Sequence, residues 1–209
     1  MKQEIWICRH GNRIDFVDPT WVGYDPYLSP DGILQAEATG RRLKRETIHH
    51  IFASPFLRAV QTANCIAEEL DLEIKIEYGF SEWLNADWFD EIPQCIPMEE
   101  LVKRFPRVNA SYVSAIIPKF PENYGMAANR SGEAARIIAD LYCESNLLFV
   151  GHGLSVHGII AGLFPEHPEI SPGLCSLTKI VRLDNKVIMD INSDSSHLSS
   201  GESSANRFN

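Results

Sequence analysis

Residues 5–11 read IWICRHG, and residues 147–153 read LLFVGHG. Each stretch is a short apolar run that ends in a histidine followed by a glycine, at positions 10–11 and 152–153. Short apolar runs of this kind predict buried strands of a mostly parallel sheet. Parallel strands place their carboxyl ends along one edge of the sheet. We therefore expect His10 and His152 to meet at that edge, provided that their strands are neighbours.

The chain between and around these strands alternates between strand-like and helix-like patterns, which predicts βαβ units and an α/β fold. Strands are expected at 4–8, 49–54, 72–78 and 147–150, and a closing hairpin at 176–191. Helices are expected at 28–46, 54–70 and 131–144. The first two begin with Ser29-Pro30 and Ser54-Pro55. These pairs are typical of an N-cap serine followed by proline in the first helical position.

Two regions interrupt this alternation. Residues 79–130 contain five prolines and an early cluster of aromatic residues, which predicts an insertion over one end of the sheet. From residue 192 onward, seven of eighteen residues are serine, a composition typical of a flexible tail. We therefore expect one domain over 1–191, with 79–130 as a cap-like insertion, and a tail over 192–209.

Composition narrows the classes of partner and compartment. The chain has 209 residues and a formal net charge of −9, and an acidic surface repels nucleic acid and anionic membranes. No apolar run approaches the length of a membrane span, and the first residues lack signal-peptide architecture. Five dispersed cysteines without a CxxC motif indicate reduced thiols. We expect a cytoplasmic protein, for which a homodimer is an open alternative.

Three arginines accompany the two histidines. Arg9 and Arg13 flank His10, and Arg58 lies in the first turn of an expected helix, whose free N–H groups favour an anion. Guanidinium groups match phosphate oxygens in a bidentate manner, so this set predicts a phosphate pocket with His152. We expect no metal there, because cationic neighbours disfavour a divalent ion and no carboxylate lies nearby in the sequence.

Three ordered motifs carry a family resemblance: RHG at 9–11, SPFLRAVQTA at 54–63 and GHG at 151–153. Together they resemble the histidine phosphatase superfamily, also called phosphoglycerate mutase-like. The longer reading RHGNRIDF…YDPYLSPDGILQA is most similar to the suppressor-of-T-cell-signalling phosphatases. The resemblance implies a three-layer α/β/α fold of the phosphoglycerate mutase type, without a cofactor.

The resemblance also implies roles at matching positions. His10 would be the nucleophile that attacks phosphorus, and His152 would bind the transferring group. Arg9, Arg13 and Arg58 would hold the phosphoryl oxygens.

The family draws a proton donor from the insertion, and Glu82 lies there in GFSEWLNADWF at 79–89. A carboxyl group beside Trp83 and a bound phosphate would have a raised pKa, as a general acid requires. Aromatic residues such as Trp83 and Tyr24 are candidates to line the substrate mouth.

Three functions remain open. The leading hypothesis is a metal-independent phosphomonoester hydrolase that acts on a phosphorylated small molecule or a phosphopeptide. A phosphoglycerate mutase is less favoured, because RHGNRIDF lacks the RHGxSxxN pattern of that branch. A weakly catalytic module that binds a phosphorylated ligand is the third. Asn12 stands where many family members have glutamate, so no role is carried over to it.

Overall fold

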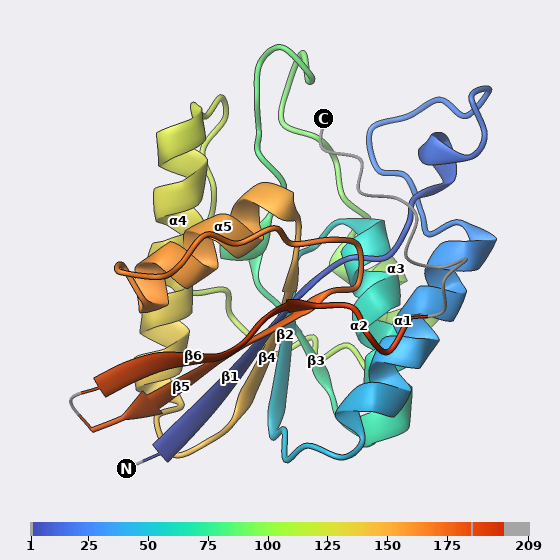
Figure 1. The fold of residues 1–209 in the computed structure, drawn as a ribbon. Helices are drawn as coiled ribbons and strands as arrows, with labels where there is room; N and C mark the ends of the chain where they lie inside the picture. The colour runs from blue at the N-terminus through green and yellow to red at the C-terminus, as the bar shows by residue number, and fades with distance from the viewer. Residues whose placement is uncertain (1, 185, 199–209) are drawn as a thin grey trace.

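The computed structural model describes residues 2–184 and 186–198 and is built around a six-stranded sheet with the strand order β3-β2-β4-β1-β5-β6 (Figure 1). The strands are β1 Lys2–Arg9, β2 His50–Ala53, β3 Ile74–Ile76, β4 Leu147–Gly151, β5 Leu177–Leu183 and β6 Lys186–Asp194. The first four strands in this order run parallel to one another, β5 pairs antiparallel with β1, and β6 pairs antiparallel with β5. The expected mostly parallel α/β fold is confirmed.

Strands β1 and β4 are direct neighbours, which is the condition under which His10 and His152 were expected to meet. They pair in parallel with Arg9 opposite Gly151, so His10 and His152 follow paired positions at one edge of the sheet. The backbone N–H of His10 continues the pairing, because it donates to the Gly151 carbonyl at 2.9 Å. Ordinary strand pairing therefore sets the separation of the two histidine corners.

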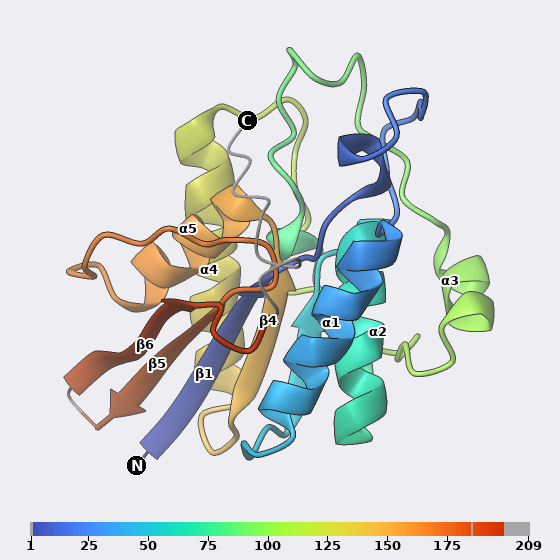
Figure 2. The same cartoon turned by 45° about the vertical axis from the view of Figure 1, so that its right-hand side comes forward.

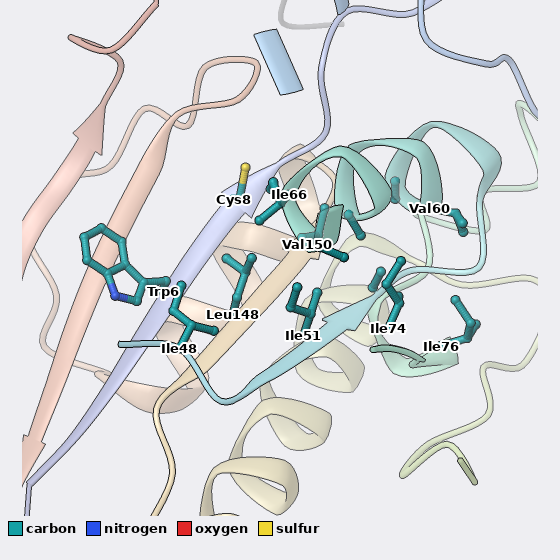
Figure 3. Packing of buried hydrophobic residues seen from close by; sticks show 14 of the residues in the cluster. Trp6, Cys8, Ile48, Ile51, Val60, Ile66, Ile74, Ile76, Leu148 and Val150 are labelled. Carbon is teal, nitrogen blue, oxygen red and sulfur yellow. The ribbon is translucent and has the colours of Figure 1, made fainter. Parts of the chain in front are cut away.

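Helices cover both faces of the sheet (Figures 1 and 2). They are α1 Pro30–Leu43, α2 Leu57–Leu70, α3 Met98–Arg104, α4 Tyr124–Leu141 and α5 Gly153–Leu163, with short 3-10 turns η1 Ile14–Phe16 and η2 Tyr78–Phe80. One face packs Ile51, Leu148 and Val150 against Val60 and Ile66 of α2, as Figure 3 shows. Helices α4 and α5 bury the opposite face. In the described part of the chain, no helix is both long and apolar enough to cross a membrane.

Two helices begin at places that differ from the prediction. Ser54 does not cap α2, which starts at Leu57 after Phe56 and makes no side-chain cap bond there. Helix α4 starts at Tyr124 rather than 131, because the Asn123 side chain accepts from Met126 N at 2.9 Å. In contrast, Ser29 caps α1 as predicted, since its hydroxyl accepts from the backbone of the third helical residue.

The chain end is more ordered than expected over its first residues. Strand β6 continues to Asp194, three residues into the range 192–209 assigned to the tail. Leu198 is buried against a small cluster that includes Leu28, Ala36 and Cys175. The remainder of the predicted tail, 199–209, lies outside the described residues.

Candidate active site

His10 is buried, and its hydrogen bonds fix the tautomer of its ring. Its Nδ1 lies 2.7 Å from the carbonyl oxygen of Gly11, which can only accept, so Nδ1 carries the proton. Burial lowers the pKa of His10 well below its usual value, and the positive charge of Arg58 lowers it further. The ring is therefore neutral at physiological pH, with the lone pair on Nε2.

His152 faces His10 across the sheet edge, with ring centroids 5.2 Å apart. Its Nε2 lies 2.7 Å from the hydroxyl of Ser54, and its Nδ1 lies 3.3 Å from a carboxylate oxygen of Glu82. A carboxylate only accepts, so a proton on Nδ1 and a hydrogen bond from the Ser54 hydroxyl to Nε2 suit these two neighbours. Burial, followed by the charge of Arg58, lowers the pKa of His152 well below its usual value.

Arg58 lies in the first turn of α2 and connects the two histidines to the insertion. Its Nε donates to His10 Nε2 at 3.3 Å, and its Nη2 donates to Glu82 Oε2 at 3.0 Å. On its other side, Asp25 lies 3.6 Å away, and the Asp25 carboxylate also accepts from the Leu57 backbone at the start of α2. Asp25, which the sequence did not single out, thus anchors the loop after β1 to the helix that carries Arg58.

Glu82 enters the pocket from the segment that follows η2. Burial raises its pKa, but the Arg58 guanidinium lowers it, and the net pKa lies below the usual range. The raised pKa expected from the sequence concerns Glu82 beside a bound phosphate, whereas the pKa is lowered in the free site. The reason is the direct ion pair with Arg58, which the sequence did not predict.

Arg9 and Arg13 occupy the pocket from different sides. The guanidinium of Arg9 is held by a bond from Nη1 to the Pro172 carbonyl at 3.1 Å. The guanidinium of Arg13 pairs with Asp15 through two N–H groups, one of them Nε at 2.9 Å, and lies over the ring of Phe16. Arg9 therefore donates a hydrogen bond to a neutral carbonyl group, whereas Arg13 already has an anionic partner.

Several buried N–H groups at this site have no hydrogen-bond acceptor. Among the described residues they include Arg9 Nε, Arg58 Nη1 and His152 Nδ1, although Glu82 lies near the last of these. Buried donors without acceptors are rare in proteins and call for an explanation at each position. A tetrahedral oxyanion between the two histidine rings would supply acceptors to this set.

The pocket in front of these groups has a volume of about 540 Å³. Its lining combines four polar side chains with an aromatic and apolar wall. The polar side chains are Arg9, His10, Arg13 and Glu82, and the wall is formed by Phe16, Trp83, Trp88, Tyr124 and Leu154. Arg58 and His152 are buried behind this lining. Trp83, a candidate from the sequence for the substrate mouth, lies in this wall. Tyr24 is not part of this lining, because it packs against Phe89 at 5.8 Å and faces a separate hollow beside Asp25.

A metal ion deserves a direct test, because the folded chain supplies a carboxylate that the sequence did not place nearby. Donor atoms of His10, Glu82 and His152 all lie within 4.8 Å of one another. However, Arg58 donates to both His10 and Glu82 at this position. A divalent cation would therefore compete with a guanidinium for the same lone pairs, and the local charge favours an anion.

The glycine at each histidine corner has a different reason to be there. A Cβ on Gly11 would lie 2.6 Å from the carbonyl oxygen of Gly32, so α1 can approach the loop only at glycine. A Cβ on Gly153 would meet nothing closer than Arg9, at 3.7 Å, which is ordinary contact. Asn12 also serves the approach of α1, because its amide donates to Asp31 at 2.7 Å.

The sequence profile of the Histidine phosphatase superfamily (branch 1) matches residues 5–192. The chain belongs to this family. The predicted family is thereby confirmed, and the matched range includes both histidine corners, Arg58 and the insertion.

Individual relatives are more distant. Ubiquitin-associated and SH3 domain-containing protein B of Mus musculus is 28% identical over 216 residues, which cover 80% of this chain and 34% of that protein. The ecdysteroid-phosphate phosphatase of Drosophila melanogaster is 27% identical over 148 residues, covering 53% of this chain and 19% of that protein. The chain thus spans about a third or less of the length of these two relatives.

Among solved structures, the ecdysone phosphate phosphatase of Bombyx mori in complex with tungstate superposes with a TM-score of 0.75. It is 20% identical, and the match covers 94% of this chain and 98% of that one. A phosphoglycerate mutase of Bacillus anthracis gives a TM-score of 0.67 at 21% identity, over 94% of this chain and 95% of that one. At these identities the likeness establishes the fold, which is the predicted phosphoglycerate mutase type.

Proposed function

We propose that the chain is a metal-independent phosphomonoester hydrolase that works through a phosphohistidine on His10. The observation that carries the proposal is the neutral His10 ring, whose Nε2 lone pair is surrounded by Arg58, His152 and Glu82. A neutral imidazole nitrogen is a competent nucleophile toward phosphorus. The surrounding N–H donors without acceptors would stabilise the negative charge of the phosphoryl oxygens.

In the first step, a bond forms between His10 Nε2 and phosphorus while the bond from phosphorus to the ester oxygen breaks. The leaving oxygen takes a proton from the carboxyl group of Glu82. The N–H groups of Arg58 that point to His10 and Glu82 in the free site would turn to the phosphoryl oxygens. This exchange uncovers the lone pair on Nε2 at the moment when substrate is bound.

In the second step, water attacks the phosphohistidine. The carboxylate of Glu82 accepts a proton from that water, a new bond forms between phosphorus and oxygen, and the bond to His10 Nε2 breaks. Inorganic phosphate and the neutral ring of His10 result. The same carboxyl group therefore acts first as an acid and then as a base.

This cycle requires Glu82 to be protonated when substrate is bound, although its pKa is lowered in the free site. A phosphate next to Glu82 adds negative charge and draws the Arg58 guanidinium to its own oxygens. Both changes raise the pKa of the carboxyl group. Substrate binding would thus produce the acid that the first step consumes.

The aromatic wall favours substrates whose leaving group has an apolar or flat face. Trp83, Trp88 and Tyr124 lie on that side of the pocket, with ring centroids 5.1 Å apart for the two tryptophans. The Bombyx mori structure bound to tungstate and the Drosophila relative, both named as phosphatases of steroid phosphates, support this reading. In a substrate screen, we expect higher hydrolysis rates for aryl phosphates and phosphotyrosine peptides than for sugar phosphates.

The test is hydrolysis of an aryl phosphate in the presence of EDTA by the wild type and by His10→Ala. We expect activity that survives the chelator and disappears in the variant, together with an acid-labile phosphoryl group on the quenched wild type. Full activity in His10→Ala would exclude the mechanism. Isomerisation of phosphoglycerates that depends on a bisphosphate primer would instead identify a mutase.

A further inference from the structure

One buried ion pair holds the segment that carries Glu82, although neither of its members enters the pocket. Arg130 lies in the second turn of α4, and Glu122 immediately precedes the N-cap of that helix. Both are buried, with 7% of each residue exposed. The Arg130 guanidinium meets the Glu122 carboxylate as a fork, with Nε to Oε1 at 2.6 Å and Nη2 to Oε2 at 2.8 Å.

The remaining N–H groups of Arg130 bind three backbone carbonyls around Glu82. Nη1 donates to Gly79 O at 2.7 Å and to Ser81 O at 3.2 Å, and Nη2 donates to Glu82 O at 3.1 Å. With the two bonds to Glu122, these occupy all five N–H groups that an arginine side chain possesses. Arg130 therefore fixes the backbone on the side opposite to the pocket.

Glu122 also binds the two residues that follow Glu82. Its carbonyl accepts from Trp83 Nε1 at 2.9 Å, and its backbone N–H donates to Leu84 O at 2.9 Å. Gly79 seats this segment directly on α4, since a Cβ there would lie 2.5 Å from that of Ala134. The backbone of the proposed proton donor is thus attached to α4, on the face of the sheet opposite to Arg58.

Within the pocket, by contrast, the Glu82 side chain has few attachments. One oxygen accepts from the Trp83 backbone at 3.0 Å, and the other lies against Arg58 and His152. In the proposed cycle Arg58 turns to the phosphoryl oxygens, so that contact weakens when the acid must donate. The position of the carboxyl group then depends on its backbone.

We propose that Arg130 and Glu122 are positioning residues that hold the Glu82 carboxyl at the leaving oxygen and the Trp83 ring at the substrate mouth. The inference rests on the proposed function, because it assigns Glu82 the role of proton donor. It adds a requirement that neither histidine corner supplies. The backbone around Glu82 must be bound to α4 by the five N–H donors of a guanidinium group. A lysine, with three donors, cannot make the same set of hydrogen bonds.

The test compares kcat/KM for two aryl phosphates in Arg130→Lys, in Glu82→Gln and in the matched control Arg182→Lys. Arg182 lies near the end of β5 and pairs with Asp140 of α4 at 2.6 Å. Phenyl phosphate needs a proton on its leaving oxygen, whereas 2,4-dinitrophenyl phosphate releases a stable anion. We expect Arg130→Lys to lower kcat/KM about 10- to 100-fold for phenyl phosphate and less than about threefold for the dinitrophenyl ester. Arg182→Lys should change neither.

Suppose that Glu82→Gln loses much more activity on phenyl phosphate than on the dinitrophenyl ester. Equal losses on both esters in Arg130→Lys, or no loss on either, would then overturn the inference and leave the proposed function intact. If Glu82→Gln itself affects both esters alike, Glu82 is not the proton donor and the proposed function fails at that step. If Arg130→Lys does not fold, the double variant Arg130→Met/Glu122→Leu removes both buried charges and answers the same question. It must show the same selective loss on phenyl phosphate.

Discussion

The two histidine corners and the insertion supply opposite sides of one pocket, but different forces hold them. His10 and His152 follow strands β1 and β4, where backbone pairing and apolar packing fix every residue up to Arg9 and Gly151. Residues 77–84 belong to no strand, and buried charged side chains hold them instead. The proposed nucleophile is thus placed by the backbone of the sheet, and the proposed acid is placed by ion pairs and carboxylate hydrogen bonds.

This difference has an energetic consequence. Sheet pairing spreads its stabilisation over many equivalent bonds, so no single side chain decides where His10 lies. A buried charge concentrates its effect, because removal of one partner leaves the other unpaired in a poorly solvated site. We therefore expect single substitutions to disturb the insertion more readily than the histidine corners.

The largest effect should come from Arg58, the side chain that joins the two regions. Arg58→Lys keeps a positive charge but loses the fork that reaches both His10 and Glu82. We expect kcat/KM for an aryl phosphate to fall about 10²- to 10³-fold, because the planar donor set stabilises the transferring group. The control is Arg42→Lys, whose arginine lies on α1 and pairs with Glu46, beyond the end of that helix, at 2.7 Å. A loss below about tenfold would mean that charge alone suffices.

The next largest effect is a loss of folding stability, and it comes from a substitution at Glu77, next to the insertion. The fully buried carboxylate of Glu77 accepts from five donors: Gly79 N, Tyr112 Oη, Ser114 Oγ, Ala115 N and Ile116 N. Glu77→Gln removes the charge and introduces an amide that faces other donors. We expect the free energy of unfolding to fall by about 2–4 kcal/mol in a urea titration.

Glu73→Gln is the matched control for that titration, because this glutamate is exposed and makes one bond, to Asn109 at 2.9 Å. Its substitution should change the free energy of unfolding by less than about 0.5 kcal/mol. Equal stabilities of the two variants would show that the Glu77 network is dispensable. The contrast between the two regions would then lose its energetic basis.

The sequence was most informative about the region that local patterns control. Apolar runs predicted the strands, and the parallel order of the strands predicted that His10 and His152 would meet. The same reasoning failed at Ser54, because a serine before proline looks like a helix cap. Its hydroxyl instead bonds to His152, which is ninety-eight positions further along the chain. Sequence spacing does not encode such a contact.

The insertion shows the same limit more strongly. Glu82 could be proposed from the family resemblance, but Arg130 and Glu122 carried no signal, since a helical arginine is normally a solvated surface residue. The predicted start of the helix at 131 even left Arg130 outside α4. Ser131, the first residue of the predicted helix, donates to the Ala127 carbonyl one turn earlier in the observed helix.

A smaller effect should appear in the pH dependence of stability, and it concerns the two histidine corners. The folded-state pKa values of His10 and His152 are lowered, so near the usual value of 6.5 the unfolded chain takes up protons that the folded chain does not. Their contribution to stability is present above that pH and is lost as the pH falls from 6.5 toward the lowered values.

We expect the free energy of unfolding of the wild type to fall between about pH 7.5 and pH 5, and the double variant His10→Asn/His152→Asn to show a shallower fall. The reason is that asparagine does not titrate in this range. His167→Asn, at a histidine outside the site, is the control. Parallel slopes for the double variant and the wild type would show that these two rings are not held neutral by the fold.

The smallest effect concerns Arg13, which belongs to neither region because it lies on the loop after β1. Its guanidinium is paired with Asp15, with about a quarter of each side chain exposed, so the pair contributes modestly. If Arg13 binds the substrate phosphate as proposed, the phosphate shares it with that carboxylate. We expect Asp15→Asn to lower KM for an aryl phosphate by up to about fivefold with little change in kcat. Asp18→Asn, at an exposed aspartate of the same loop, is the control. A rise in KM would show that Asp15 orients Arg13 rather than competing with the substrate.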